Sequence, residues 1–157
     1  MDPKNELDRE LLIGKLARLL YAEQESPESE EELIRMADTV LNRPEYAGYP
    51  DTPEEVMSQP GQYSPFNPKN KRNKVMLGFG PQHPRWAEYV GYAEKALDPA
   101  RMRSKYTHYF AGDPPPWAGH MVGLTRIGDH WFGTEPRRKK LPGGEGVLVA
   151  RKKEETE

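Results

Sequence analysis

The sequence predicts one α+β domain that is mainly helical, with a small β-element in the C-terminal half. Apolar residues recur at helical spacing early in the chain, whereas short strand-like runs begin only at residue 105. A chain of 157 residues has room for a single core. Most of the 16 Pro and 14 Gly residues fall between residues 42 and 146, which predicts long ordered loops around a few short elements.

Two helices are expected at the start of the chain. The first covers residues 5–24. Ser29 can cap the second, Glu32 follows three residues later as a capping box requires, and Pro44 marks the end. The apolar stripes that support these helices consist of Leu12, Leu16, Leu19 and Leu20 in the first, and of Leu33, Ile34, Ala37, Val40 and Leu41 in the second.

Shorter elements follow. Thr52 is expected to cap a short third helix, and residues 59–67 combine turn residues with aromatics, as in a hairpin or an extended loop. Residues 69–74 read as a basic loop tip, and residues 84–97 as a helix. Strands are expected at residues 105–110, 121–127, 130–132 and 147–150.

Composition argues against several classes of protein. The net charge is −2, which gives no bulk argument for a nucleic-acid or anionic-membrane partner. No apolar run approaches the roughly 20 residues of a membrane span, and the N-terminus lacks the pattern of a secretory signal. We expect residues 1–150 to form a single domain and residues 151–157 to form a disordered tail.

Glu23 is the first candidate for chemistry. It lies near the end of the first helix, beside an apolar face, where partial desolvation would raise its pKa. A carboxyl group that stays protonated near neutral pH can act as a general acid in glycosidic cleavage. The plainer reading is a surface carboxylate at a helix end, and with 25 acidic residues in the chain the residues alone favour that reading.

Five short segments, in order along the chain, resemble the SleB/CwlJ-type cell wall hydrolases, the spore-cortex-lytic enzymes and their relatives. The family pattern A-R-x-x-x-x-E is matched at residues 17–23, and V-x-L-N-R approximately at residues 39–43. The remaining matches are an aromatic-Pro-x-Thr segment at residues 49–52 followed by Q-P-x-x-aromatic-Ser at residues 59–64, an aromatic pair at residues 109–110, and I-G-x-H-x-F at residues 127–132. The chain departs from the family pattern in three places: Ala22 stands in place of Gly, Tyr63 stands in place of Phe, and residues 69–83 differ from the family loop.

The resemblance implies a lysozyme-like α+β domain with a groove for a glycan strand. It implies a lytic transglycosylase that cleaves between N-acetylmuramic acid and N-acetylglucosamine, with Glu23 as general acid and then base, and with 1,6-anhydro products. The substrate-binding residues expected from the matched segments are Gln59, Gln62, Tyr63, Ser64 and Tyr109, although Gln59 and Ser64 could instead satisfy turn backbone. Strand alternation places Tyr109 on the groove side, opposite His108 and a core Phe110.

Other readings stay open at this point. A lysozyme-type hydrolase needs a second carboxylate about 5 to 9.5 Å from the first, and Glu25, Asp38, Asp51 and Asp113 are the candidates. A non-catalytic wall-binding or virion structural module could keep the same groove. The basic runs at residues 137–140 and 151–153 give weak support to a DNA-associated protein.

Cofactors and location complete the expectations. The histidines match no short metal motif, so we expect no metal site and no cofactor, and we expect His130 to pack near the core. The partner is expected to be peptidoglycan, with no nucleic acid and no membrane span. Without a signal, an enzyme made in the cytoplasm would reach the wall during host lysis or from a virion, which suggests a phage origin. The four histidines are His83, His108, His120 and His130.

Overall fold

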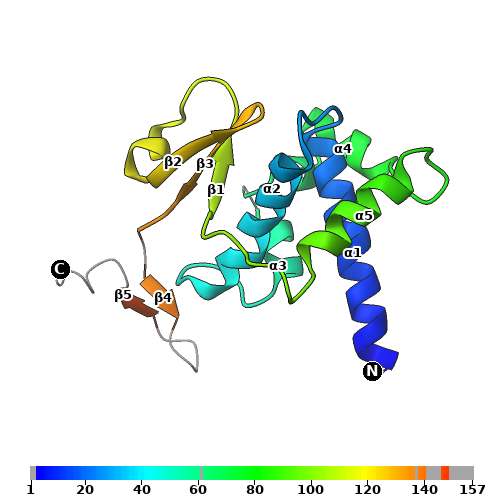
Figure 1. Ribbon diagram of the computed structural model, residues 1–157, viewed down its shortest axis with the longest axis horizontal. Helices are drawn as coiled ribbons and strands as arrows, with labels where there is room; N and C mark the ends of the chain where they lie inside the picture. The colour runs from blue at the N-terminus through cyan, green and yellow to red at the C-terminus, as the bar shows by residue number, and fades with distance from the viewer. Residues whose placement is uncertain (1–2, 61, 137, 141–145, 149–157) are drawn as a thin grey trace.

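A computed structural model describes residues 3–60, 62–136, 138–140 and 146–148 and confirms the mixed α+β class. In Figure 1 the helices lie on one side of the molecule, and the three strands of the larger sheet lie on the other. The helices are α1 (Pro3–Glu23), α2 (Glu30–Asn42), α3 (Pro53–Ser58), α4 (Lys71–Leu77) and α5 (Trp86–Ala96), with 3-10 turns η1 (Arg43–Glu45), η2 (Ser64–Phe66) and η3 (Pro116–His120). The strands are β1 (His108–Phe110), β2 (Val122–Ile127), β3 (His130–Thr134), β4 (Arg138–Lys140) and β5 (Gly146–Leu148).

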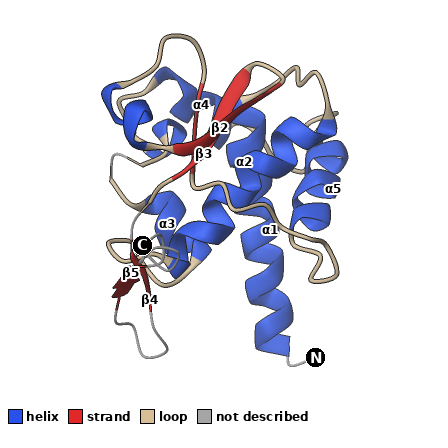
Figure 2. Ribbon diagram, turned by 60° about the vertical axis from the view of Figure 1, so that its left-hand side comes forward, coloured by secondary structure: helices blue, strands red, loops and turns tan. Residues whose placement is uncertain are grey.

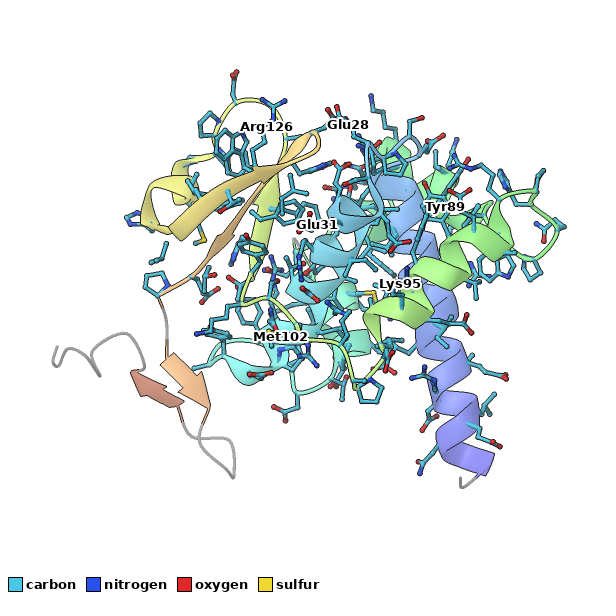
Figure 3. All side chains as sticks on the ribbon, viewed as in Figure 1. Glu28, Glu31, Tyr89, Lys95, Met102 and Arg126 are labelled. Atoms are coloured by element: carbon cyan, nitrogen blue, oxygen red, sulfur yellow. The ribbon has the colours of Figure 1, made fainter. Side chains whose placement is uncertain are left out.

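Helix α1 carries the expected apolar stripe only in its second half. Leu16, Leu19 and Leu20 are fully buried, whereas Leu7 and Leu11 are exposed where the helix extends beyond the body toward the N-terminus (Figure 1). The end of α1 is fixed from α5. Figure 3 shows Tyr89 on α5, and its hydroxyl donates to the Gln24 carbonyl at 2.6 Å. This contact holds the chain directly after Glu23.

Helix α2 begins after Ser29 and ends before Pro44, as expected, but the predicted capping box is wrong. Ser29 makes no side-chain cap bond, and the Glu32 side chain is fully buried. Its Oε2 accepts from the Asp129 backbone N–H at 3.0 Å and lies 2.7 Å from His130 Nδ1. A buried carboxylate needs hydrogen bonds, and those of Glu32 Oε2 come from Asp129, His130 and Gln24 rather than from its own helix end.

The middle of the chain differs from expectation in one place. Thr52 does cap α3, since its hydroxyl accepts from the Glu55 N–H at 3.2 Å. Of the two forms expected for residues 59–67, a hairpin or an extended loop, the described residues form no hairpin: they make a loop of turns that contains η2. The predicted basic loop tip is wrong, because Asn70 accepts from the Arg72 N–H at 2.8 Å and starts helix α4. Local capping therefore organises this basic segment.

Strands β1, β3 and β2 form an antiparallel sheet in that order. Tyr109 is opposite Phe132, and Phe132 is fully buried against the helices. Phe110 is opposite Trp131, so both project from the other face. The prediction of a core Phe110 is therefore wrong: the side chain is half-buried, and its ring lies 5.7 Å from that of Trp117.

Strands β4 and β5 form a separate two-stranded ribbon, apart from the larger sheet (Figure 2). β5 corresponds to the start of the strand expected at residues 147–150, and the expected tail at residues 151–157 lies outside the described residues. None of the helices in the described part of the chain is long and apolar enough to cross a membrane.

Candidate active site

A cavity of about 650 Å³ opens between the end of α1, the loops after α2 and α3, and the edge of the sheet at β1. Segments that are far apart in the sequence meet here because the buried face of α2 holds both the helices and the sheet. The side chains and backbone that line the cavity belong to Glu23, Arg43, Gly48, Tyr49, Gln62, Tyr63, Ser64, His108, Tyr109, Trp117, His120, Met121, Glu135 and Pro136.

Glu23 reaches the cavity from the last turn of α1. Its carboxylate Oε2 accepts a hydrogen bond of 2.7 Å from the Tyr109 hydroxyl. Burial, and then the neighbouring Glu23 charge, raise the pKa of Tyr109 well above its usual value of 10.0. Tyr109 therefore remains a neutral donor at physiological pH. Tyr109 was expected on the groove side as a substrate-binding residue, and its hydroxyl is hydrogen-bonded to the candidate acid itself.

Tyr63 supports this arrangement from the side. Its ring centroid lies 6.2 Å from that of Tyr109, and its hydroxyl lies 2.9 Å from the Thr39 hydroxyl. Burial raises the pKa of Tyr63 as well. The Tyr63 ring is thus held by its packing against Tyr109 and by the hydrogen bond of its hydroxyl to Thr39 on α2. Its hydroxyl makes no hydrogen bond to the Glu23 carboxylate.

Arg43 is a site residue that sequence reasoning missed. It is buried directly after α2, where its Nε donates to the Thr107 carbonyl at 2.7 Å and its Nη1 donates to Gln62 Oε1 at 3.0 Å. The guanidinium also lies 4.7 Å from the ring centroid of Tyr63 and 5.3 Å from that of Tyr49. A planar cation with several donors can hold aromatic walls and polar groups together. The Asn-Arg pair that ends α2 was the available signal.

A second carboxylate, Glu135, lines the same cavity. Its side chain is 1% exposed, and its Oε1 accepts from the Tyr49 hydroxyl at 2.7 Å. His108 closes the cluster, with Nδ1 3.7 Å from Glu135 Oε1 and Nε2 3.4 Å from the Tyr49 hydroxyl. Glu135 could not be identified from the sequence, because nothing near residue 135 distinguishes it from a surface Glu.

The four carboxylates proposed as second groups do not line this cavity. Glu25, Asp51 and Asp113 are exposed elsewhere. Asp38 is fully buried on α2, where it accepts from the Ser104 N–H at 3.0 Å and forms an ion pair with Arg101. Its role is to anchor the loop that leads to β1.

Behind Tyr109 lies the buried pair of Glu32 and His130. The His130 ring packs edge-on against Tyr109, with centroids 5.5 Å apart, and the histidine is 8% exposed, so the expectation that it packs near the core is confirmed. Gln24, the residue after Glu23, donates from Nε2 to Glu32 Oε2 at 3.3 Å and to Asp129 Oδ2 at 3.2 Å. The end of α1 and the β2–β3 turn therefore both donate hydrogen bonds to the Glu32 carboxylate.

Gly128 explains why the turn can approach so closely. Its φ is +64°, and a Cβ at this position would lie 2.6 Å from Glu32 Cδ. Only glycine has both the conformational freedom and the space for this contact. The Gly in the I-G-x-H-x-F segment is thus required by the carboxylate beneath it.

The other predicted substrate-binding residues divide between two places. Gln62, Tyr63 and Ser64 line the cavity that contains Glu23. Gln59 lines a neighbouring pocket of about 250 Å³ together with Tyr63 and Phe66. Tyr63 separates the two spaces, so a direct role for Gln59 at Glu23 stays a prediction.

The histidines are dispersed around the site. His108 and His120 line the cavity, whereas His83 Nε2 lies 3.4 Å from the Tyr21 hydroxyl on the helical side. Within the described residues there is no group of three or more side chains placed to hold a metal ion. The chemistry that the cavity offers through these residues is proton transfer, hydrogen bonding and aromatic contact.

Comparison with known proteins identifies a family. No curated protein and no solved structure matches the chain. A family model described as Cell Wall Hydrolase matches residues 27–133, which begin four residues after Glu23 and end within β3. This segment contains α2, Arg43, Tyr63 and Tyr109, and it covers well over half of the 157 residues. The chain therefore belongs to the Cell Wall Hydrolase family.

Proposed function

We propose that this cell wall hydrolase cleaves the bond between N-acetylmuramic acid and N-acetylglucosamine in peptidoglycan as a lytic transglycosylase, with Glu23 as its acid and base. The observation that carries the proposal is the contact of 2.7 Å between Glu23 and the neutral donor Tyr109 inside a cavity of about 650 Å³. A carboxyl group held by a hydrogen bond and facing a cavity is placed to exchange a proton with a bound glycosidic oxygen.

The reaction can proceed with one carboxyl group. Glu23 gives its proton to the glycosidic oxygen, the bond from that oxygen to C1 of the muramic sugar breaks, and the N-acetylglucosamine end leaves as an alcohol. The Glu23 carboxylate then accepts the proton of the muramic 6-hydroxyl, whose oxygen forms the new bond to C1. The enzyme regains its proton and no water is consumed. Proximity of the internal nucleophile supplies much of the rate.

Tyr109 assigns different tasks to the two oxygens of Glu23. Its hydroxyl donates to Oε2, which leaves Oε1 as the oxygen that carries the transferred proton. In the protonated acid, the carbonyl oxygen can still accept this bond. A fixed rotamer keeps the proton in line with the glycosidic oxygen, and small displacements of reacting groups are costly.

The environment of Glu135 favours the transglycosylase over a hydrolase. An inverting hydrolase needs a second carboxylate that contacts a water molecule, and a retaining one needs a carboxylate that reaches C1. The Glu135 side chain is 1% exposed and holds the Tyr49 hydroxyl, so it is poorly placed to reach either. A hydrolase that uses Glu135 is the second candidate function, because Glu135 lines the same cavity as Glu23.

Mass spectrometry of the muropeptides released from purified peptidoglycan tests the proposal. The wild type should release anhydro-muropeptides, and Glu23→Gln should release almost none at an unchanged melting temperature. Glu25→Gln is the matched control, since Glu25 is an exposed carboxylate two residues away. Reducing-end muramic products would establish the hydrolase instead. No release from several wall types would leave a non-catalytic wall-binding module.

A further inference from the structure

The outer face of the three-stranded sheet, turned away from the helices, carries a row of aromatic side chains. Phe110 on β1, Trp131 on β3 and Arg126 on β2 are paired in register, so their side chains project side by side from this face. Trp131 is 36% exposed, and Leu124, whose side chain lies against Gly133 two residues further along β3, is 41% exposed. Figure 3 shows Arg126 at the β2–β3 end of the sheet. Exposed apolar side chains that lie together beside a charged one mark a candidate binding surface.

This face is continuous with the cavity that contains Glu23. Trp117 lines the cavity, and its ring centroid lies 5.0 Å from that of His108 and 5.7 Å from that of Phe110. His108 and Phe110 are two residues apart on β1 and therefore project from the same face. Met121, another cavity residue, lies over Gly133 of β3, where a Cβ would come within 2.9 Å of the Met121 Cβ. The wall of the cavity thus extends onto the sheet without a break.

We propose that this surface, formed by Trp117, Phe110, Trp131 and Arg126, binds sugar rings of the glycan strand beyond the cleavage site. The proposal rests on the proposed function, because it assigns the position of the same polymer outside the catalytic cavity. The occupant is the glycan rather than a protein because the surface begins at the cavity wall, and the chain cut at Glu23 must leave the cavity along some face.

The chemistry of the surface suits a neutral, hydroxyl-rich ring. One face of a pyranose is made of C–H groups, which pack against the flat face of an indole, while the hydroxyl groups around the edge need donors and acceptors. Trp131 provides the flat apolar face. Arg126 provides exposed guanidinium donors beside it, and its Nε already donates to the Gly128 carbonyl at 3.1 Å, which holds the side chain near the turn.

The test is sedimentation binding to insoluble peptidoglycan in the Glu23→Gln background, so that the polymer stays intact. Trp131→Ala should weaken binding about fivefold to tenfold, as expected for the loss of one aromatic stacking contact. Trp131→Phe should restore most of the affinity, and in the active protein Trp131→Ala should raise KM on the polymer with little change in kcat. Leu77→Ala is the control, since Leu77 is 69% exposed on α4 and lies outside this surface.

Two results would overturn the proposal. If a folded Trp131→Ala variant bound peptidoglycan as well as the parent protein does, the surface would not be a binding site for the glycan. A loss seen on intact peptidoglycan but absent on glycan strands freed of their stem peptides would assign the surface to the peptide instead of the sugar. Because binding is measured without cleavage, failure of the proposed chemistry would show separately, as a wild type that releases no muropeptides.

Discussion

Removing the hydroxyl group of Tyr109 should slow cleavage without weakening the binding of the polymer. Tyr109→Phe keeps the ring, which packs against His130, Phe132 and Tyr63, and deletes only the donor to Glu23 Oε2. The carboxyl group then loses the contact that fixes its rotamer and assigns the proton to its other oxygen.

The size of the effect follows from the hydrogen bond that is lost. A bond of 2.7 Å to a carboxylate contributes about 1.5–3 kcal/mol, which corresponds to a decrease in kcat of about 10-fold to 150-fold if the contact is needed in the transition state. KM should change by less than about threefold, because a hydroxyl that is engaged with Glu23 is not a principal contact for the ground-state substrate.

The assay is the rate of anhydro-muropeptide release at several polymer concentrations, with Tyr63→Phe as the matched control. Tyr63→Phe also deletes a buried phenol hydroxyl in the cavity wall, but that hydroxyl is bonded to Thr39 and not to Glu23. It should lower stability by about 1 kcal/mol and leave kcat close to that of the wild type. Retention of kcat within twofold by Tyr109→Phe, or an equal loss in Tyr63→Phe, would refute the positioning role.

Three further predictions concern stability and cofactors. Gly128→Ala should destabilise the protein by about 1–3 kcal/mol in urea unfolding, because φ is +64° and the new Cβ would meet Glu32; a neutral result would mean that the β2–β3 turn adjusts freely. The folded-state pKa of Tyr109 lies well above 10.0, so folded protein keeps a proton that the unfolded chain loses: the free energy of unfolding should be unaffected by this group below about pH 10 and decrease above it, less steeply in Tyr109→Phe. EDTA should leave muropeptide release unchanged, and inhibition that zinc reverses would contradict the proton-transfer chemistry.

Much of the helical part could be predicted from local pattern. The stripe of Leu16, Leu19 and Leu20 is buried as expected, and the Thr52 cap starts α3. These features depend on residues three or four positions apart, which a single sequence displays directly. The basic segment from Lys71 was misread because Asn70, the residue that caps it, resembles any other turn residue until its hydrogen bond is seen.

The residues that line the candidate site could be predicted in part, because the matched segments contain Glu23, Gln62, Tyr63, Ser64 and Tyr109, whereas their contacts could not. The family resemblance pointed to Glu23 and brought Tyr109 to the groove, but it did not indicate that the two side chains meet. It also gave no sign of Glu135, whose role depends on a contact with Tyr49, 86 residues earlier in the chain.

By itself, the sequence determined the α+β class and the positions of α1, α2, α3 and α5, because periodicity and capping are local, and the family segments singled out Glu23 at the end of α1 as the candidate acid. Only the tertiary structure decided which polar groups meet. Glu32 accepts a hydrogen bond from the Asp129 backbone N–H, 97 residues away, instead of capping its own helix, because a buried carboxylate takes its hydrogen bonds from whichever groups the packing brings to it.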